Sequence, residues 1–231
     1  MREGDMRGAV IMDNKKYNTM IVNLYAGAGA GKTTCAWIIA SELKKRGVIT
    51  EYVPEYAKEL VWEKRRDMLD GSYKNQLAIL KEQNHRLARL VGQVEVVVTD
   101  SPILLGAMYI KERKPEFEAI VLGQFQKYNN FNLFINRGKT YEQTGRVHTL
   151  TESREVDRAI RQFLDGNNIY YGTYYHKTVP VIVDNIQKRL AAAVPQKKSL
   201  LGTVAEKKRQ ADALNTSATP PKRSIPKDFI L

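Results

Sequence analysis

A glycine-rich stretch near the N-terminus has the residue types needed to bind a phosphate. Residues 26–34 read Ala-Gly-Ala-Gly-Ala-Gly-Lys-Thr-Thr, and the pattern G-x-x-x-x-G-K-[ST] is met at Gly31, Lys32 and Thr33. Ala26 stands where the first glycine is usual, and its small side chain still permits the tight turn. Because few Cβ atoms obstruct the backbone, successive N–H groups can turn inward around an anion. The stretch therefore predicts a phosphate-binding loop.

The side chains of this loop suit a nucleoside triphosphate and a magnesium ion. Lys32 would reach the β- and γ-phosphates, and the Thr33 hydroxyl would complete the coordination shell of Mg²⁺. ATP and Mg²⁺ are thus the expected cofactors. The alternative interpretation of residues 26–34 is a Gly/Ala-rich linker that matches the loop pattern by chance. The loop residues expected to bind the nucleotide are Ala26, Gly27, Ala28, Gly29, Ala30, Gly31, Lys32, Thr33 and Thr34.

Elements with strand and helix patterns alternate around this loop, and Asp100 directly follows one of the strands. Ligands of open α/β sheets bind outside the carboxyl ends of parallel strands, so Asp100 can face the loop. The order predicts an α/β fold, a three-layer P-loop NTPase with a mainly parallel five-stranded sheet. Strands are expected at residues 20–25, 48–53, 94–99, 131–136 and 179–184, and helices at 31–46, 54–62, 73–91, 103–111, 116–128, 152–164 and 185–193.

Residues 137–150 form a polar, cation-bearing segment after the fourth predicted strand. We interpret this segment as a lid that closes over phosphates, with a plain surface loop as the alternative. On the helix at 73–91, His85 and Arg86 are expected to face solvent. Cys35 should pack in the first turn of a helix that faces the sheet.

Charge and composition divide the chain into three parts. Residues 1–19 are a polar lead-in, 20–194 the domain that carries the phosphate loop, and 195–231 a basic tail expected to be disordered. The net charge is +12; the tail holds eight Lys/Arg against three Asp/Glu, a net of +5, which leaves +7 for the body. Excess positive charge in both parts indicates affinity for a polyanion, with simple solubility as the alternative.

The sequence also bears on location. There is no run of about 18 apolar residues and no signal-peptide pattern at the N-terminus. A single cysteine rules out an internal disulfide. We therefore expect a soluble cytoplasmic protein without membrane partners, in the host cell cytoplasm if viral, and the sequence leaves the oligomeric state open.

Among proteins with such a loop, small phosphotransferases fit best. The length of 231 residues argues against motors and helicases, and no Asn-Lys-x-Asp sequence is present for guanine selection. Four segments then resemble the P-loop kinase branch containing the ribosylnicotinamide kinase domain of bacterial NAD-biosynthesis regulators. They are the phosphate loop, residues 54–59 (Pro-Glu-Tyr-Ala-Lys-Glu), 99–102 (Thr-Asp-Ser-Pro), and Gly145-Arg146 leading to Asp157-Arg158-x-Ile160.

Within that branch, the chain also looks like the bacteriophage enzymes that phosphorylate 5-hydroxymethyluracil in DNA during thymidine hypermodification. The resemblance covers about residues 20–190, and its phosphate loop is its most specific part. It implies that Lys32 and Thr33 take the γ-phosphate and Mg²⁺, and that Asp100 is a metal-water ligand or general base. A turn residue is the alternative for Asp100.

The resemblance implies three further site residues. Glu55 would be the acceptor-binding carboxylate, unless it only stabilises a helix dipole. Arg137 and Arg146 would be cations of the lid. Arg137 would bind the nucleotide, and Arg146 would have a catalytic role. The leading hypothesis is a kinase with DNA as its substrate; the alternatives are a small-molecule nucleoside or ribosylnicotinamide kinase and a P-loop ATPase accessory of DNA metabolism.

Overall fold

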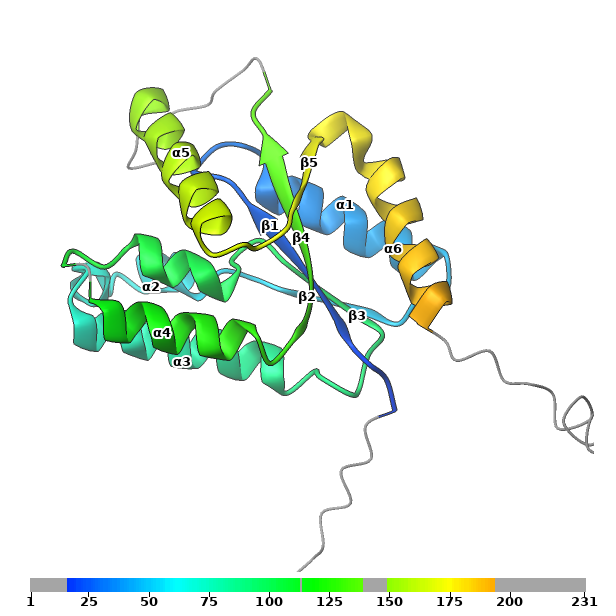
Figure 1. Ribbon diagram of the computed structural model, residues 1–231, viewed down its shortest axis with the longest axis horizontal. Coiled ribbons are helices and arrows are strands. Elements are labelled where there is room, and N and C mark those ends of the chain that lie inside the picture. The colour runs from blue at the N-terminus through cyan, green and yellow to red at the C-terminus, as the bar shows by residue number, and fades with distance from the viewer. Residues whose placement is uncertain (1–15, 113, 139–148, 194–231) are drawn as a thin grey trace, which may run out of the picture. The chain divides into compact units, whose positions relative to one another are not determined.

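Five parallel strands form the centre of the protein, in the order β2-β3-β1-β4-β5. The computed structural model describes residues 16–112, 114–138 and 149–193 (Figure 1). The strands are β1 (Met20–Tyr25), β2 (Thr50–Val53), β3 (Val96–Thr99), β4 (Asn129–Asn136) and β5 (Gly172–Tyr175). The helices are α1 (Lys32–Lys45), α2 (Tyr56–Trp62), α3 (Tyr73–Ala88), α4 (Pro115–Phe125), α5 (Leu150–Gly166) and α6 (Val179–Ala193).

The middle strand, β1, is buried along its whole length and ends at the glycine-rich loop. It pairs with β3 from Met20 and Val96 onward, and with β4 from Met20 and Asn129 onward. The chain leaves β1 towards β2 and leaves β4 towards β5, on the other side of the sheet. Loops that diverge in this way open a crevice at the carboxyl ends of the strands, which is where α/β proteins bind ligands.

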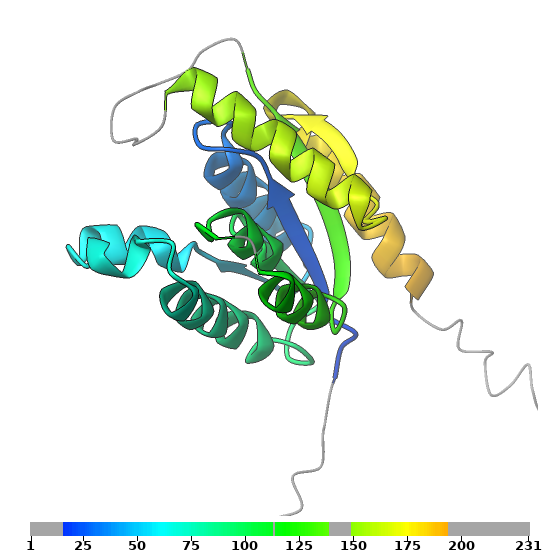
Figure 2. The same cartoon turned by 60° about the vertical axis from the view of Figure 1, so that its left-hand side comes forward.

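Helices cover both faces of this sheet, as Figures 1 and 2 show from two directions. One core joins the sheet to α3, α4 and α5, with Tyr25, Phe117 and Phe163 among its buried members. On the other face lie α1 and α6 (Figure 1). Cys35, in the first turn of α1, is fully buried, and burial raises the pKa of its thiol to about 11. Its predicted role in packing is confirmed.

Local sequence explains where the helices near the site begin. Gly31 precedes α1 with φ 90°, a left-handed backbone that glycine adopts without a Cβ penalty. Ser72 caps α3 by accepting a hydrogen bond from the Asn75 amide. At α5, Thr149 and Glu152 form a reciprocal capping box, which fixes the start of the helix that follows the predicted lid.

The predicted fold is confirmed, but the fifth strand was placed wrongly. The sequence prediction put it at 179–184, whereas the structure has β5 at Gly172–Tyr175 and α6 beginning at Val179. Val179, Ile182 and Val183, with Ile186, are the buried residues of α6. Their spacing of three, four and seven is helical, so tertiary packing of this stripe overrides the strand preference of β-branched residues.

Other expectations need smaller adjustments. The segment after β3 is a 3₁₀ helix at Ile103–Met108 rather than an α-helix to residue 111. Residues 16–19, assigned to the lead-in, are tied to the body, because the Thr19 hydroxyl donates to the Val94 carbonyl at 2.6 Å. Residues 139–148 of the lid and the tail at 195–231 lie outside the described residues. Among the helices that are described, none is long and apolar enough to cross a bilayer.

Candidate active site

The loop between β1 and α1 has the backbone that a phosphate-binding loop requires. Gly29 and Gly31 have φ values of 75° and 90°, a conformation that side chains with a Cβ rarely adopt. Ala26 has no left-handed backbone, which explains why alanine is tolerated in place of the first glycine. The loop ends at the N-terminus of α1, whose partial positive charge favours an anion. Thr34 is exposed at this end.

Lys32 is held inside the loop rather than extended into solvent. Its ammonium donates to the Ala26 carbonyl at 2.7 Å and to the Gly27 carbonyl at 3.3 Å. Burial lowers the pKa of Lys32, while the negative charges of Glu55 and Asp100 act in the opposite direction. The cation therefore lies among carboxylates, at the position where the loop would receive a phosphate.

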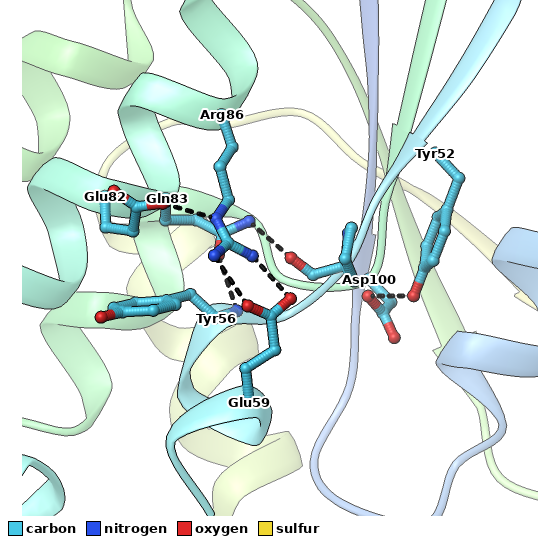
Figure 3. A network of polar contacts seen from close by, with 8 residues as sticks. Tyr52, Tyr56, Glu59, Glu82, Gln83, Arg86 and Asp100 are labelled. Atoms are coloured by element: carbon cyan, nitrogen blue, oxygen red, sulfur yellow. Dashed lines mark hydrogen bonds and ion pairs between the residues drawn. The ribbon is translucent and has the colours of Figure 1, made fainter. Parts of the chain in front are cut away.

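Asp100 and Thr33 meet at the carboxyl ends of β1 and β3. The Thr33 hydroxyl donates to Oδ2 of Asp100 at 2.5 Å, and the Tyr52 hydroxyl donates to Oδ1 at 2.9 Å. Asp100 is 3% exposed, so both of its oxygens are fixed by neighbours. Figure 3 shows Tyr52 approaching Asp100 from β2. The Asp100 carboxylate is thus held by two hydroxyl groups at the carboxyl end of β3, and its predicted catalytic role stays a prediction.

Glu55 is the residue that directly precedes α2, at its N-cap position. Its carboxylate makes no capping hydrogen bond with the helix. Burial raises the pKa of Glu55, and the nearby charge of Asp100 adds to the increase, whereas Lys32 lowers it. Burial also raises the pKa of Tyr109 to about 12, with a contribution from the charge of Glu55. Glu55 is thus a half-buried carboxylate close to the loop lysine.

A paired arginine and aspartate hold the first half of the loop. Asp157, from α5, accepts a hydrogen bond from the Gly27 amide at 2.6 Å and pairs with Nε of Arg137 at 2.5 Å. Arg137 also donates to the carbonyls of Ala28, at 2.5 Å, and Ser153, at 3.0 Å. Its side chain and that of Asp157 are 13% and 16% exposed. The predicted contact of Arg137 with the nucleotide stays a prediction.

A second ion-pair network joins α2 to α3 (Figure 3). The Arg86 guanidinium binds both oxygens of Glu59 at 2.7 Å and also pairs with Glu82. Gln83 accepts from the Tyr56 amide and donates to the Pro54 carbonyl, on either side of Glu55. The expectation that Arg86 faces solvent is wrong, because its side chain is 16% exposed. His85, by contrast, is exposed as predicted.

The structure thus brings together most of the predicted site. Lys32, Thr33, Asp100 and Glu55 gather at the loop, whereas Arg146 lies outside the described residues. Residues with no predicted role also contribute: Tyr52, Tyr109 and Ser153, and Asp157, whose motif was noted without a role. A tyrosine inside a strand resembles a packing residue, so only the register of β2 against β3 could have indicated Tyr52.

The oxygen donors at the loop fit a magnesium ion. Mg²⁺ favours oxygen ligands and keeps several waters, so a hydroxyl, a carboxylate and substrate phosphates suffice. Thr33 and Asp100 supply the first two at hydrogen-bond distance from each other. Among the described residues, no group of three or more His, Cys, Asp or Glu side chains is placed to hold a metal ion without a substrate.

The fold and the loop define a P-loop nucleotide-binding domain. A family described as "AAA domain" matches residues 22–177, and the chain belongs to this family. No curated protein sequence matches the chain.

Solved structures support the fold at low sequence identity. A NadR protein in complex with NR is 18% identical over 74% of this chain and 52% of its own, with a TM-score of 0.55. A thymidylate kinase from Ehrlichia chaffeensis is 14% identical over 73% of this chain and 98% of its own, with a TM-score of 0.51. The chain therefore spans about half the length of the NadR protein.

Proposed function

We propose that the protein is an ATP- and Mg²⁺-dependent phosphotransferase that acts on an alcohol group. The observation that carries this proposal is the joint placement of Lys32, the Thr33–Asp100 pair and the half-buried Glu55 at one phosphate-binding loop. The loop amides and Lys32 would neutralise the transferring phosphoryl group. When bound through Thr33 and Asp100, Mg²⁺ would supply charge stabilisation to the phosphate oxygens.

The residues of this chain divide the reaction among them. The oxygen of the acceptor hydroxyl forms a bond to the γ-phosphorus as the bond to the β–γ bridging oxygen breaks. ADP leaves with that electron pair, and the hydroxyl proton passes to a carboxylate. Glu55 is the better base, because its pKa is raised by burial whereas Asp100 already accepts two hydrogen bonds. The likeness to a thymidylate kinase agrees with such chemistry.

The acceptor we propose is the hydroxymethyl group of 5-hydroxymethyluracil in DNA, a step of thymidine hypermodification in a bacteriophage. A base within a duplex must be extruded to reach such a site. Trp62, at the end of the helix that Glu55 begins, is 77% exposed and available for stacking on a neighbouring base. Lys64, Arg65 and Arg66 follow it and are all exposed. The net charge of +12 also favours DNA.

A small nucleoside or ribosylnicotinamide is the second candidate acceptor. The likeness to a NadR protein in complex with NR favours it. Glu55 would then bind a sugar hydroxyl as well as take its proton. A third candidate, an ATPase accessory of DNA metabolism, would release phosphate to water without an acceptor.

One assay separates these candidates. The protein is incubated with γ-labelled ATP and, in parallel, with unmodified DNA, 5-hydroxymethyluracil DNA, free nucleosides and ribosylnicotinamide. Label in hydroxymethyluracil DNA supports the proposal, and label in a free nucleoside with none in DNA at low salt overturns the DNA assignment. Label found only in inorganic phosphate indicates the ATPase. Lys32→Ala is the negative control, and Lys81→Ala, an exposed lysine of α3, is its matched control.

A further inference from the structure

The first half of the phosphate loop is held by side chains that come from outside the loop. In Figures 1 and 2, the N-terminal half of α5 lies beside the loop that follows β1. Asp157 of α5 receives the Gly27 amide at 2.6 Å, and Arg137, just after β4, donates to the Ala28 carbonyl at 2.5 Å. One carboxylate and one guanidinium thus fix the Ala26–Gly27 and the Ala28–Gly29 peptide units.

The Ala26–Gly27 peptide unit also holds Lys32. Its ammonium donates to the carbonyls of Ala26 and Gly27 at 2.7 and 3.3 Å. The peptide unit between these two residues contains the Ala26 carbonyl and the Gly27 amide, so Asp157 and Lys32 bind opposite sides of the same peptide. Movement of that peptide would move the ammonium that has to meet the phosphates.

The packing around Gly27 leaves no room for a side chain. A Cβ placed on Gly27 would lie 2.6 Å from the Ser153 carbonyl oxygen and 2.7 Å from a guanidinium nitrogen of Arg137. Real Cβ contacts are longer, so glycine is required here by close approach of α5 and not by a left-handed backbone. The loop and α5 are therefore fitted to each other at Gly27.

Charge explains why two residues are needed. Asp157 alone would put a negative charge near the phosphates, and the Arg137 charge opposes its effect on Lys32. Both side chains are largely buried, at 16% and 13% exposed. A buried ion pair offsets its desolvation only when its remaining atoms are hydrogen-bonded, and here the loop backbone supplies those partners.

We propose that Asp157 and Arg137 are positioning residues for phosphoryl transfer: as a pair they fix the 26–28 backbone and thereby place Lys32 for the nucleotide. This inference rests on the proposed binding of ATP by the loop. It assigns Arg137 to the loop backbone and gives α5 a direct contact with the site.

The test is a double-mutant cycle on ATP binding. Asp157→Ala and Arg137→Ala should each weaken ATP affinity about tenfold, because the Lys32 ammonium would no longer be held in place for the phosphates. A tenfold loss corresponds to about 1.4 kcal/mol of binding free energy. Each single variant leaves a buried charge without its partner. The double variant should therefore bind ATP about as well as either single variant, and additive losses would contradict pairing. ATP Kd is measured by calorimetry, with the melting temperature recorded for every variant.

A second pair of variants tests the fit at the backbone. Gly27→Ala should weaken ATP binding to a similar extent, because its Cβ meets Ser153 and Arg137. Gly123→Ala, in α4, is the matched control, since its Cβ would meet nothing within 4 Å. Asp157→Asn preserves the size of the side chain and can still accept a hydrogen bond from the Gly27 amide. It therefore replaces Asp157→Ala in the cycle if that variant does not fold.

The outcomes distinguish the inference from the proposed function. If the wild-type protein binds no ATP, the proposed function fails. If the wild type binds ATP and the variants of Asp157 and Arg137 lower only the melting temperature, with ATP Kd unchanged, the pair is merely structural and this inference is overturned. Weaker ATP binding by folded variants, with non-additivity in the cycle, supports it.

Discussion

At the scale of single residues, Asp100 is defined by the two hydroxyls that donate to it. Thr33 and Tyr52 each bind a different carboxylate oxygen. Asp100→Asn keeps the size of the side chain but loses its charge, so turnover should fall about a hundredfold or more while ATP still binds. A rate assay beside a melting curve measures both effects. Loss of folding without a specific loss of rate would make Asp100 structural.

Tyr52→Phe should give a smaller loss of rate than Asp100→Asn. It removes one hydrogen bond and leaves the carboxylate charge and the Thr33 contact in place. A single neutral donor contributes about 1 kcal/mol, so the rate should fall about fivefold. An effect as large as that of Asp100→Asn would show that Tyr52 acts on the substrate directly.

Glu55 gives the site its expected pH dependence. A general base must be ionised, and burial raises the pKa of this carboxyl. The acidic limb of the kcat profile should therefore lie above the usual range of glutamate, near 4.3 in model peptides. Glu55→Gln should lose most activity and abolish that limb. A limb that survives in the variant would assign it to another group.

The same group affects the free energy of unfolding. Because the folded state raises the pKa of Glu55, its contribution is most favourable at low pH and is lost as pH rises through the folded pKa. Glu55→Gln, which cannot ionise, should gain stability relative to the wild type as pH rises from 4 to 8. Melting curves across this range measure the difference, and a constant difference would contradict the raised pKa.

At the scale of elements, α2 and α3 are locked by the Arg86 network beside Glu55. Arg86 makes a bidentate pair with Glu59, a second pair with Glu82, and lies over the Tyr56 ring at 4.7 Å. Arg86→Met should lower the free energy of unfolding by about 1–2 kcal/mol, because charged hydrogen bonds are lost and Glu59 keeps its charge.

The control for this prediction lies at the end of the same helix. Arg89 is exposed, and Arg89→Met should change stability by less than about 0.5 kcal/mol. Denaturant unfolding of both variants gives the comparison. Equal effects would mean that the network contributes nothing beyond a surface arginine.

The acceptor KM of Arg86→Met should also rise, since Gln83 of α3 holds the backbone on both sides of Glu55.

At the scale of the whole molecule, charge provides the test of a DNA substrate. Deleting residues 196–231 removes a net positive charge from the sequence. If the substrate is DNA, the deletion should weaken binding and flatten its salt dependence by about 0.9 units of log–log slope per lost phosphate contact. kcat at saturating DNA should stay nearly unchanged. The basic residues removed are Lys197, Lys198, Lys207, Lys208, Arg209, Lys222, Arg223 and Lys227.

A small acceptor would behave differently in the same experiment. A neutral nucleoside releases few counterions, so its KM should respond neither to salt nor to the deletion. Fluorescence anisotropy with labelled duplex DNA, titrated at several salt concentrations, measures the slope for both lengths of the protein. Identical slopes for the two lengths would show that the tail makes no phosphate contacts with DNA.

The sequence by itself determined the phosphate loop, the parallel α/β fold and the position of Asp100. These features depend on local rules: small residues around an anion, apolar runs of strand length, and the edge of the sheet at which strand ends meet. Each rule acts within a few residues, so one sequence suffices to apply it. The same rules failed at 179–184, where a β-branched run can be a strand or a buried helix and only packing decides.

Only the tertiary structure decided which side chains meet across long separations in the chain. Asp157 reaches Gly27 over 130 residues, and Tyr52 reaches Asp100 over 48. Such contacts depend on the register of the strands and on where α5 crosses the sheet, which no local pattern encodes. The raised pKa of Glu55 has the same origin, because desolvation arises only when the chain has folded around the carboxylate.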